Sequence, residues 1–504
     1  MNKIMSLIDL SFNLKQKIKL WDGLIKQGLF HIVKKDLYAL QDARVPREFV
    51  CELCGIARRV QLNLLILRWL KPYVRKFDSL ELDSTNAERT LYASALMRIG
   101  AQHEAHDILQ QMTDDKDPQI LLAKSHLEIF QWNYDKAIPL LKKYIYLLEQ
   151  DSYAILVGKL NLAAAYVAEH DWVNAIPLVD FLLTVCREKK HWLIYSNALE
   201  LSAQIYIYKY DFTKAEARLR EATVHLQGSG QNYEFFVKKW LAIIEILTKP
   251  TTAKSRKQML AIQLQGAQLK DWETIREMDL FFAKATQNQE LFLKVYFGTK
   301  SKSYRVRMKK VFQSQFPIPE RYLWRSDFLT STNAPQLDIK TGDTNAAGIS
   351  LRHQPILLKT LQALVKDSYA PFSVGQLMSL IYPGEYFDSS SSPQRIYQAV
   401  FRLRSWLDKN QIPIQIKTES GHFSLKAIGP LTLNLYRKQC NKPYIDSTLS
   451  EFLSQWAKKA FAVKDIQETQ HLSERASQRL LRKSVNNGTL ECMKLGKKNI
   501  YKAI

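Results

Sequence analysis

The chain has 504 residues, of which 46% are hydrophobic and 24% are charged, a composition typical of soluble globular proteins. That length exceeds what one hydrophobic core supports and favours about three domains. Only 17 Gly and 16 Pro are present, which excludes a mainly β, turn-rich or low-complexity chain, so the composition predicts a largely helical protein.

The chain is basic, with 72 Lys and Arg against 49 Asp and Glu and a formal charge of +23. The excess lies mainly toward the C-terminal end, since residues 351–504 hold 23 basic against 11 acidic residues, and residues 291–330 hold 9 against 2. A basic end joined to a near-neutral body indicates a polyanion-binding module attached to something else. A solubilising surface would produce the same imbalance, so the motifs have to decide between the two.

The cysteines and the apolar segments bear on compartment and on metal binding. The cysteines are few and scattered, which indicates no disulfide framework: Cys51, Cys54, Cys186, Cys440 and Cys492. The Cys51–Cys54 spacing suits a metal, but no second Cys/His pair lies near it, so two cysteines on one helical turn is the simpler interpretation. The first residues lack the apolar core of a signal peptide, and the most apolar stretch, residues 62–70, contains Asn63 and Arg68. We therefore expect a cytoplasmic protein that does not cross a membrane.

The first half of the chain contains a repeated signature of Asn or Asp, an aromatic residue, two further residues and Ala. Its copies are Asn133–Ala137, Asp171–Ala175 and Asp211–Ala215, with a weaker one at Gln102–Ala105. The signature Ala residues are 32, 38 and 40 residues apart, and a small residue stands twelve positions before each: Ala93, Ser125, Ala163 and Ala203. Small residues let two antiparallel helices approach closely, and the Asn or Asp can cap the second helix. The pattern predicts helical hairpins that stack on one another.

These repeats resemble the tetratricopeptide repeat (TPR), stretched beyond its usual length in the later copies. The resemblance covers residues 86–228 most closely and extends to residues 14–80 and 232–296. It implies a TPR-like array over residues 1–312 that binds a protein or peptide partner or associates with a second copy of the chain. The aromatic residues of the signature fit a packed interior as well as a binding surface.

The periodicity changes after residue 312. Residues 313–348 form a basic, Pro-containing linker with a short strand at Leu337–Asp343, and helices follow over residues 355–366, from Ser373, and from Gln394 to about Lys409. The third helix has one apolar side, formed by Ile396, Val400, Leu403 and Leu407. Residues 412–425 alternate around a Glu-Ser-Gly turn, which predicts a β-hairpin.

Strand, helices and hairpin resemble the winged-helix effector domain of the OmpR-like response regulators. The segments that carry the resemblance are Leu380–Gly384, Arg402–Arg404 and Ile416–Phe423. It assigns a winged helix to residues 349–430 and implies that the third helix enters the DNA major groove while the hairpin touches the neighbouring minor groove or backbone. The implied DNA-binding residues are Gln394, Arg395, Gln398, Arg402, Arg404, Lys417, Thr418, Ser420 and His422.

Two features depart from that family. Ser420 stands where a basic residue is common, and Glu419 puts a negative charge near the expected phosphate path. A winged helix that binds protein instead of DNA is therefore the alternative for this domain.

Residues 445–504 repeat the plan in smaller form. They contain an amphipathic helix around Leu449–Trp456, a short helix at Val463–Thr469, a third helix from Ser473, and a hairpin with a Gly-Lys-Lys tip. The layout resembles a general bacterial winged helix, which presents a basic helix and a basic hairpin to DNA. The implied DNA-binding residues are Arg475, Gln478, Arg479, Arg482, Lys497 and Lys498, although a basic surface can also be merely solvated.

The chain contains no phosphate-binding loop and no His, Ser or Cys motif of a catalytic class, so we expect no enzyme, no cofactor and no metal. The expected fold is mostly α: a TPR-like α-solenoid followed by two winged-helix (α+β) domains. The expected function is transcription regulation in a bacterium through binding of double-stranded DNA. The alternative is a non-enzymatic scaffold or adaptor whose repeats and winged helices both bind proteins.

Overall fold

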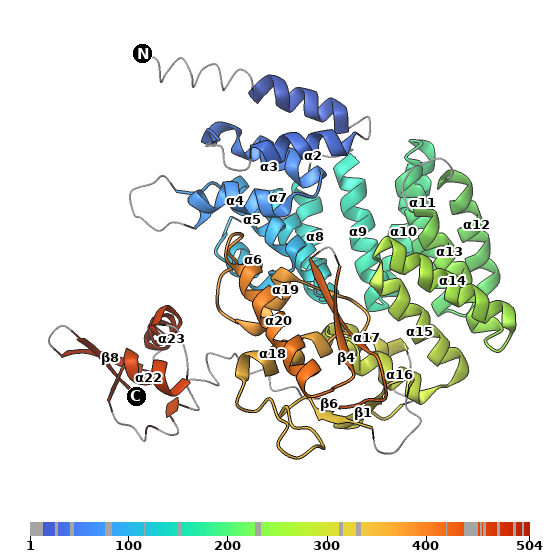
Figure 1. Cartoon of the computed structure of the whole chain (residues 1–504). Coiled ribbons are helices and arrows are strands. Elements are labelled where there is room, and N and C mark those ends of the chain that lie inside the picture. Colours follow the sequence, from blue (N-terminus) through green and yellow to red (C-terminus); the bar gives the residue numbers. More distant parts are fainter. Residues whose placement is uncertain are drawn as a thin grey trace, which may run out of the picture. The chain divides into compact units, whose positions relative to one another are not determined.

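The computed structural model is mostly α-helical, as the composition predicts, with small sheets toward the C-terminus (Figure 1). The structure describes residues 14–25, 29–40, 45–75, 83–114, 116–148, 153–226, 233–311, 316–328, 334–419, 421–437, 452–453, 456, 460–470, 474–486, 490–495 and 498–503. In these residues we find no helix that is both long enough and apolar enough to span a bilayer.

The chain forms two compact units. The larger unit contains residues 1–377 and 387–437, and the smaller unit contains residues 378–386 and 438–504. We call residues 14–311 the helical region, residues 321–436 the first mixed region and residues 460–503 the second mixed region.

Within the helical region, most helices pack mainly on the helices next to them in the sequence, whereas the last one contacts residues of several earlier helices (Figure 1). A first helix covers residues 14–25. Helices α2 to α17 follow, in order, at Phe30–Ala39, Arg47–Arg59, Asn63–Val74, Asn86–Ile99, Gln102–Gln110, Pro118–Phe130, Tyr134–Leu147, Tyr153–Glu169, Trp172–Glu188, Trp192–Tyr208, Phe212–Leu226, Tyr233–Thr248, Ala253–Leu269, Trp272–Thr286, Gln289–Phe297 and Lys302–Val311.

The repeated signature falls on the turns between paired helices, and its small residues pack where the helices meet. The signature residues Ala137, Ala175 and Ala215 are each 0% exposed, and the earlier set is equally buried: Ala93, Ser125, Ala163 and Ala203. Asp171 and Asp211 accept the backbone N–H groups of Asn174 and Lys214, both at 3.2 Å. These two aspartates therefore cap α10 and α12 as the signature predicts.

Asn133 departs from the signature. It makes no capping hydrogen bond to α8. Its side-chain Nδ2 donates to Glu128 Oε2 at 2.8 Å, and its Oδ1 accepts from Ser303 Oγ at 2.5 Å. The expected cap is absent here because the amide is bound to a residue 170 positions further along the chain.

The first mixed region combines short helices with two three-stranded sheets. Its elements are β1 (Arg321–Arg325), β2 (Gln336–Asp338), α18 (Pro355–Val365), β3 (Phe372–Ser373), α19 (Val374–Ile381), α20 (Ser392–Lys409), β4 (Ile414–Glu419), β5 (His422–Ala427) and β6 (Thr432–Tyr436). In one sheet β6 lies between an antiparallel β1 and a parallel β2, with Leu337 opposite Leu433. In the other, β5 lies between β3 and β4 and is antiparallel to both.

The predicted apolar side of the third helix and the predicted hairpin are confirmed. The side chains of α20 that were expected to be buried are at most 1% exposed: Ile396, Val400, Leu403 and Leu407. Strands β4 and β5 form the hairpin, with Thr418 opposite Phe423 and Glu419 opposite His422.

The second mixed region has the same order of elements on a smaller scale. It contains β7 (Phe461–Ala462), α22 (Val463–Gln470), α23 (Glu474–Asn486), β8 (Leu490–Leu495) and β9 (Lys498–Ala503). Strand β9 lies between β7 and β8, just as β5 lies between β3 and β4. Its core includes Ile466 and Leu481, and Phe452, which precedes the region in the chain, belongs to the same cluster; all three are 0% exposed. In both regions a two-residue strand, two helices and a hairpin follow one another, and the short strand pairs with the second strand of the hairpin.

Candidate nucleic-acid interface

The outward side of α20 carries polar side chains that are available for binding. Gln394, Gln398 and Arg402 are all exposed. Within the described residues, none of the three makes a side-chain hydrogen bond or an ion pair. Because the buried stripe fixes the rotation of the helix, these groups point to solvent along one side of an 18-residue helix.

Two aromatic residues lie on the same side of α20 and were not among the residues expected to bind. Phe401 is 67% exposed and Tyr397 is 45% exposed. The Tyr397 ring makes an edge contact with Phe423 of β5, with ring centroids 5.4 Å apart. The sequence does contain a signal for Phe401, since it stands four residues from Tyr397 and outside the apolar stripe, where a polar residue is the norm.

The hairpin is held against α20 by Arg404. Its Nε donates to the Ile416 carbonyl at 3.0 Å, and its Nη2 donates to Thr418 Oγ1 at 2.6 Å. Arg404 and Thr418 are therefore already bound to each other, which orients the hairpin relative to the helix. Lys417 and His422 are exposed on the hairpin, Arg395 is half-buried on α20, and Ser420 lies outside the described residues.

The second mixed region presents a comparable helix. On α23, Gln478 and Arg482 are exposed, and Gln478 Nε2 donates to Glu474 Oε1 at 3.0 Å. The opposite side is buried, with Ser477, Leu480 and Leu481 at 2% exposure or less. Arg475 and Arg479 lie on α23 and Lys498 begins β9, but their side chains are outside the description, as is the whole of Lys497.

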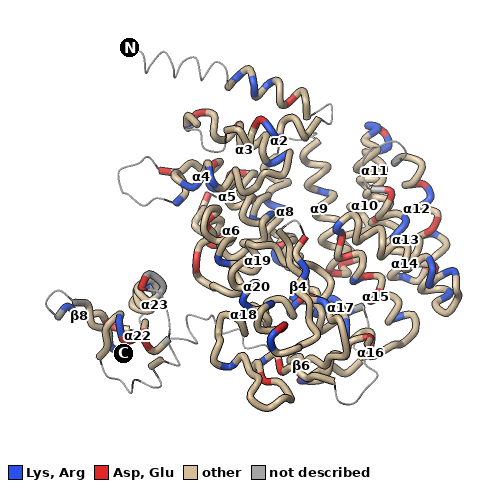
Figure 2. Tube along the Cα trace, in the orientation of Figure 1, with Lys and Arg blue, Asp and Glu red and all other residues tan. Residues whose placement is uncertain are grey.

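Positive charge accompanies both helices. Residues 392–427 hold 6 basic against 2 acidic residues, and residues 474–503 hold 8 against 2. In Figure 2 basic and acidic residues are interspersed along the helical region. The basic excess at these two helix–hairpin segments gives each a field that attracts a polyanion.

Cys51 and Cys54 are the residues whose spacing in the sequence suits a metal. Both cysteines lie on α3, with Cys51 half-buried and Cys54 buried, and burial raises the pKa of both thiols. A raised pKa disfavours the thiolate that a metal ligand or a nucleophile needs. Among the described residues, no group of three His, Cys, Asp or Glu side chains could hold a metal ion.

No family model matches the chain, and no curated protein matches it in sequence. The geometry of α20, α23 and their hairpins is therefore what supports a functional assignment.

Proposed function

We propose that the protein is a transcription regulator in which a TPR-like helical array carries two winged helices that bind double-stranded DNA. The observation that carries the proposal is α20, an amphipathic helix whose inner side is fully packed and whose outer side presents free Gln398 and Arg402 beside an ordered hairpin. A helix of this form fits the width of the DNA major groove.

The outer side of α20 has the chemistry of a surface that reads bases. A glutamine amide can pair with the edge of adenine, and an arginine can pair with guanine through two hydrogen bonds. Phe401 lies next to Arg402 and offers an apolar surface for the methyl group of thymine. We therefore assign sequence recognition to Gln398, Phe401 and Arg402.

The second helix–hairpin segment is better suited to the phosphate backbone. Its helix is short and its basic excess is larger, with Arg482 exposed on α23. Contacts from Arg and Lys to phosphates position a protein on the duplex without reading its sequence. We therefore assign general affinity to this segment.

The helical region is assigned the binding of a protein or peptide partner, on the likeness of its stacked hairpins to TPR arrays. The exposure of Phe401 and Tyr397 favours one alternative, because exposed aromatic residues also form the centres of protein interfaces. In that alternative the protein is an adaptor, and α20 docks on another protein.

The test is the binding of the full chain to a labelled mixed-sequence duplex at increasing salt concentration, followed by fluorescence anisotropy. Each neutralised phosphate contributes about 0.9 to the slope of log affinity against log salt, so we expect a steep fall. Arg220→Ala, on an exposed Arg of α12 in the helical region, is the control and should bind as the unmodified chain does. Absence of binding at low salt, or an affinity that does not change with salt concentration, would favour the adaptor.

A further inference from the structure

Apart from Lys300, whose ammonium lies 5.0 Å from the centre of the Phe372 ring, the contacts described between the first mixed region and the helical region fall into two sets. One, the late seam, joins residues 322 and 367–369 to α15, α16 and residue 298. The other, the early seam, joins residues 373–376, 387 and 388 to residues 71 and 99–104 of α4, α5 and α6. The two seams differ in chemistry and in how the chain connects across them.

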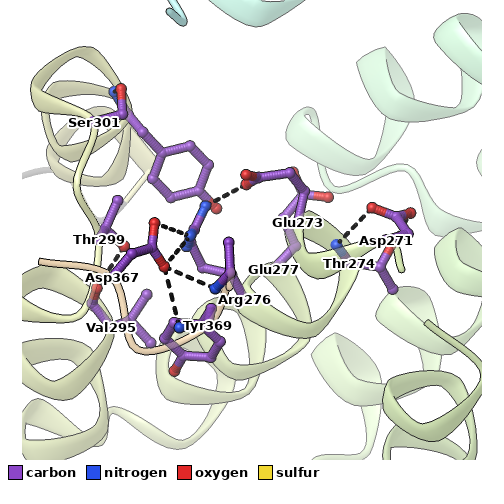
Figure 3. A network of polar contacts seen from close by, with 12 residues as sticks. Asp271, Glu273, Thr274, Arg276, Glu277, Val295, Thr299, Ser301, Asp367 and Tyr369 are labelled. Atoms are coloured by element: carbon purple, nitrogen blue, oxygen red, sulfur yellow. Dashed lines mark hydrogen bonds and ion pairs between the residues drawn. The ribbon is translucent and has the colours of Figure 1, made fainter. Parts of the chain in front are cut away.

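The late seam is centred on a buried ion pair (Figure 3). Arg276 Nη2 donates to both carboxylate oxygens of Asp367 at 2.8 Å, and the two side chains are only 2% and 1% exposed. Close by, the Tyr369 hydroxyl donates to Asp279 at 2.7 Å, and the Ser368 N–H donates to the Gly298 carbonyl at 3.0 Å.

Apolar packing reinforces the late seam where the chain itself passes from one region to the other. The Tyr322 ring of β1 stacks on Phe297 of α16, with centroids 5.0 Å apart, and its hydroxyl donates to Glu290 at 2.7 Å. Separation at this seam would expose stacked rings and a buried ion pair together, so we expect it to stay closed.

The early seam has no covalent connection nearby, since its contacts join residues 274 to 317 positions apart. Ser373 Oγ donates to the Ile99 carbonyl at 2.5 Å, and the Phe387 N–H donates to Glu104 Oε2 at 2.7 Å. Lys71 pairs with Asp388 while both side chains remain about one-third exposed. These are polar contacts: the Phe387–Glu104 hydrogen bond is buried, and the Lys71–Asp388 pair is partly exposed.

Each carboxylate of the early seam keeps other donors when the seam parts. Glu104 remains paired with Arg75 of the helical region. Asp388 still accepts the N–H groups of Ser390 and Ser391, at 2.8 and 3.0 Å. Water can replace what is lost at an exposed ion pair, so opening here leaves no buried charge without a partner.

Two glycines determine how closely the first mixed region and the helical region can approach each other at the early seam. A Cβ on Gly375 would lie 2.3 Å from the Ile99 carbonyl oxygen, and a Cβ on Gly100 would lie 2.2 Å from Gln376 Cγ. The first contact is with backbone, which cannot rotate away. Closure therefore requires Gly375, although its position near the start of α19 would accept alanine if the helix were considered alone.

We propose that the first mixed region is hinged: it stays fixed to α15 and α16 while it detaches from α4–α6. The early seam is then the point at which an event on the helical region, such as the arrival of a partner, is passed to α20. This device does not depend on DNA binding and would operate equally in an adaptor.

The test is amide hydrogen exchange on the full chain carrying Gly375→Ala. The Phe387 amide reports on the early seam and the Ser368 amide on the late seam. We expect exchange at Phe387 to accelerate by about tenfold or more, with exchange at Ser368 unchanged. Gly55→Ala on α3 is the matched control, because nothing lies within 4 Å of a Cβ placed there, and it should change neither amide.

If amide exchange accelerated at both Phe387 and Ser368, the two seams would open together and the hinge would be wrong. An unchanged exchange rate at Phe387 would also overturn it. Lys71→Gln provides an independent variant, and because the Lys71 side chain is partly exposed we expect this variant to fold. It removes one contact of the early seam and should accelerate Phe387 to a smaller extent while leaving Ser368 as it was. If Lys71→Gln leaves Phe387 unchanged or accelerates Ser368 equally, the proposal is wrong whatever the behaviour of Gly375→Ala.

Discussion

The two mixed regions share one plan and differ in what their helices present. In each, a two-residue strand, two helices and a hairpin follow in the same order and pair in the same way. Helix α20 has 18 residues and presents Phe401 and Tyr397 among polar side chains. Helix α23 has 13 residues, and its helix–hairpin segment, residues 474–503, is shorter and more basic than the corresponding residues 392–427.

The difference separates two tasks that DNA-binding proteins have to perform. Contacts to base edges provide specificity, whereas contacts to phosphates provide affinity and position. A mixed polar and aromatic helix suits the first task, and a basic helix suits the second.

The largest expected effect concerns the attachment of the first mixed region at the late seam. Asp367→Ala removes the buried partner of Arg276 and leaves it only the partly exposed Glu273, so we expect a loss of up to about 3–5 kcal/mol, the cost of breaking a buried pair. We expect that loss in the urea unfolding transition of the larger unit. Lys464→Ala in the second mixed region, which removes an exposed pair with Glu468, should change stability by less than about 0.5 kcal/mol.

Replacing both partners separates the role of charge from the role of shape. The double variant Arg276→Leu with Asp367→Leu should recover much of the stability lost in Asp367→Ala, because no buried charge remains and Glu273, which also pairs with Arg276, is partly exposed. Equal stability of Asp367→Ala and the unmodified chain would mean that the pair does not hold the late seam.

The next effect tests specificity at α20. Arg402→Ala should weaken binding to a preferred duplex by about 1–3 kcal/mol, the range for one bidentate base contact. On a mixed-sequence duplex the loss should be much smaller, since few sites present the right base. Equal losses on both duplexes, measured by fluorescence anisotropy, would assign Arg402 to phosphate instead.

A smaller and uniform effect is expected at α23. Arg482→Ala should weaken binding to preferred and mixed duplexes alike, and it should reduce the salt slope by about 0.9. The measurement is the same titration at several salt concentrations. If Arg482→Ala changed the preferred sequence and left the slope intact, the division of tasks between the two helices would be reversed.

The smallest effect lies in the helical region and depends on pH. His170 packs against Trp172 and Tyr208, and burial, together with Arg307, Lys310 and Lys284, lowers its pKa from 6.5 to about 4. The unfolded chain therefore binds a proton at this residue between about pH 6.5 and 4, where the folded chain does not. Stability should fall as the pH falls through that window.

His170→Asn is the matched variant, because asparagine tolerates the left-handed backbone found at this turn, where φ is 60°. Urea unfolding at pH 7 and at pH 5 should show a smaller difference for His170→Asn than for the unmodified chain. An identical pH dependence in both would place the titrating group elsewhere.

Local periodicity predicted the parts of the fold that neighbouring residues determine. The apolar stripe of α20 recurs within four residues, so its burial follows from the sequence. The caps at Asp171 and Asp211 likewise involve residues three positions away. The same reasoning placed the hairpin of β4 and β5 around its Glu-Ser-Gly turn.

Local periodicity did not predict the contacts between residues that are far apart in the sequence. Asn133 matches the repeat signature but binds Ser303, and Arg276 meets Asp367 across 91 residues. Arg404 was expected to face DNA along with Arg402, yet it binds the hairpin, since that depends on how β4 lies against α20. Such pairings are set by the packing of whole elements, which periodicity along one helix does not encode.

The most direct test of the account is selection from a randomised duplex pool by the full chain, with Arg402→Ala in parallel. We expect the full chain to enrich a defined sequence, and we expect Arg402→Ala still to recover DNA but to lose the preference at one or more positions. A pool that emerges unenriched from selection with the full chain would contradict sequence-specific DNA binding, and the adaptor would then be the better explanation of α20.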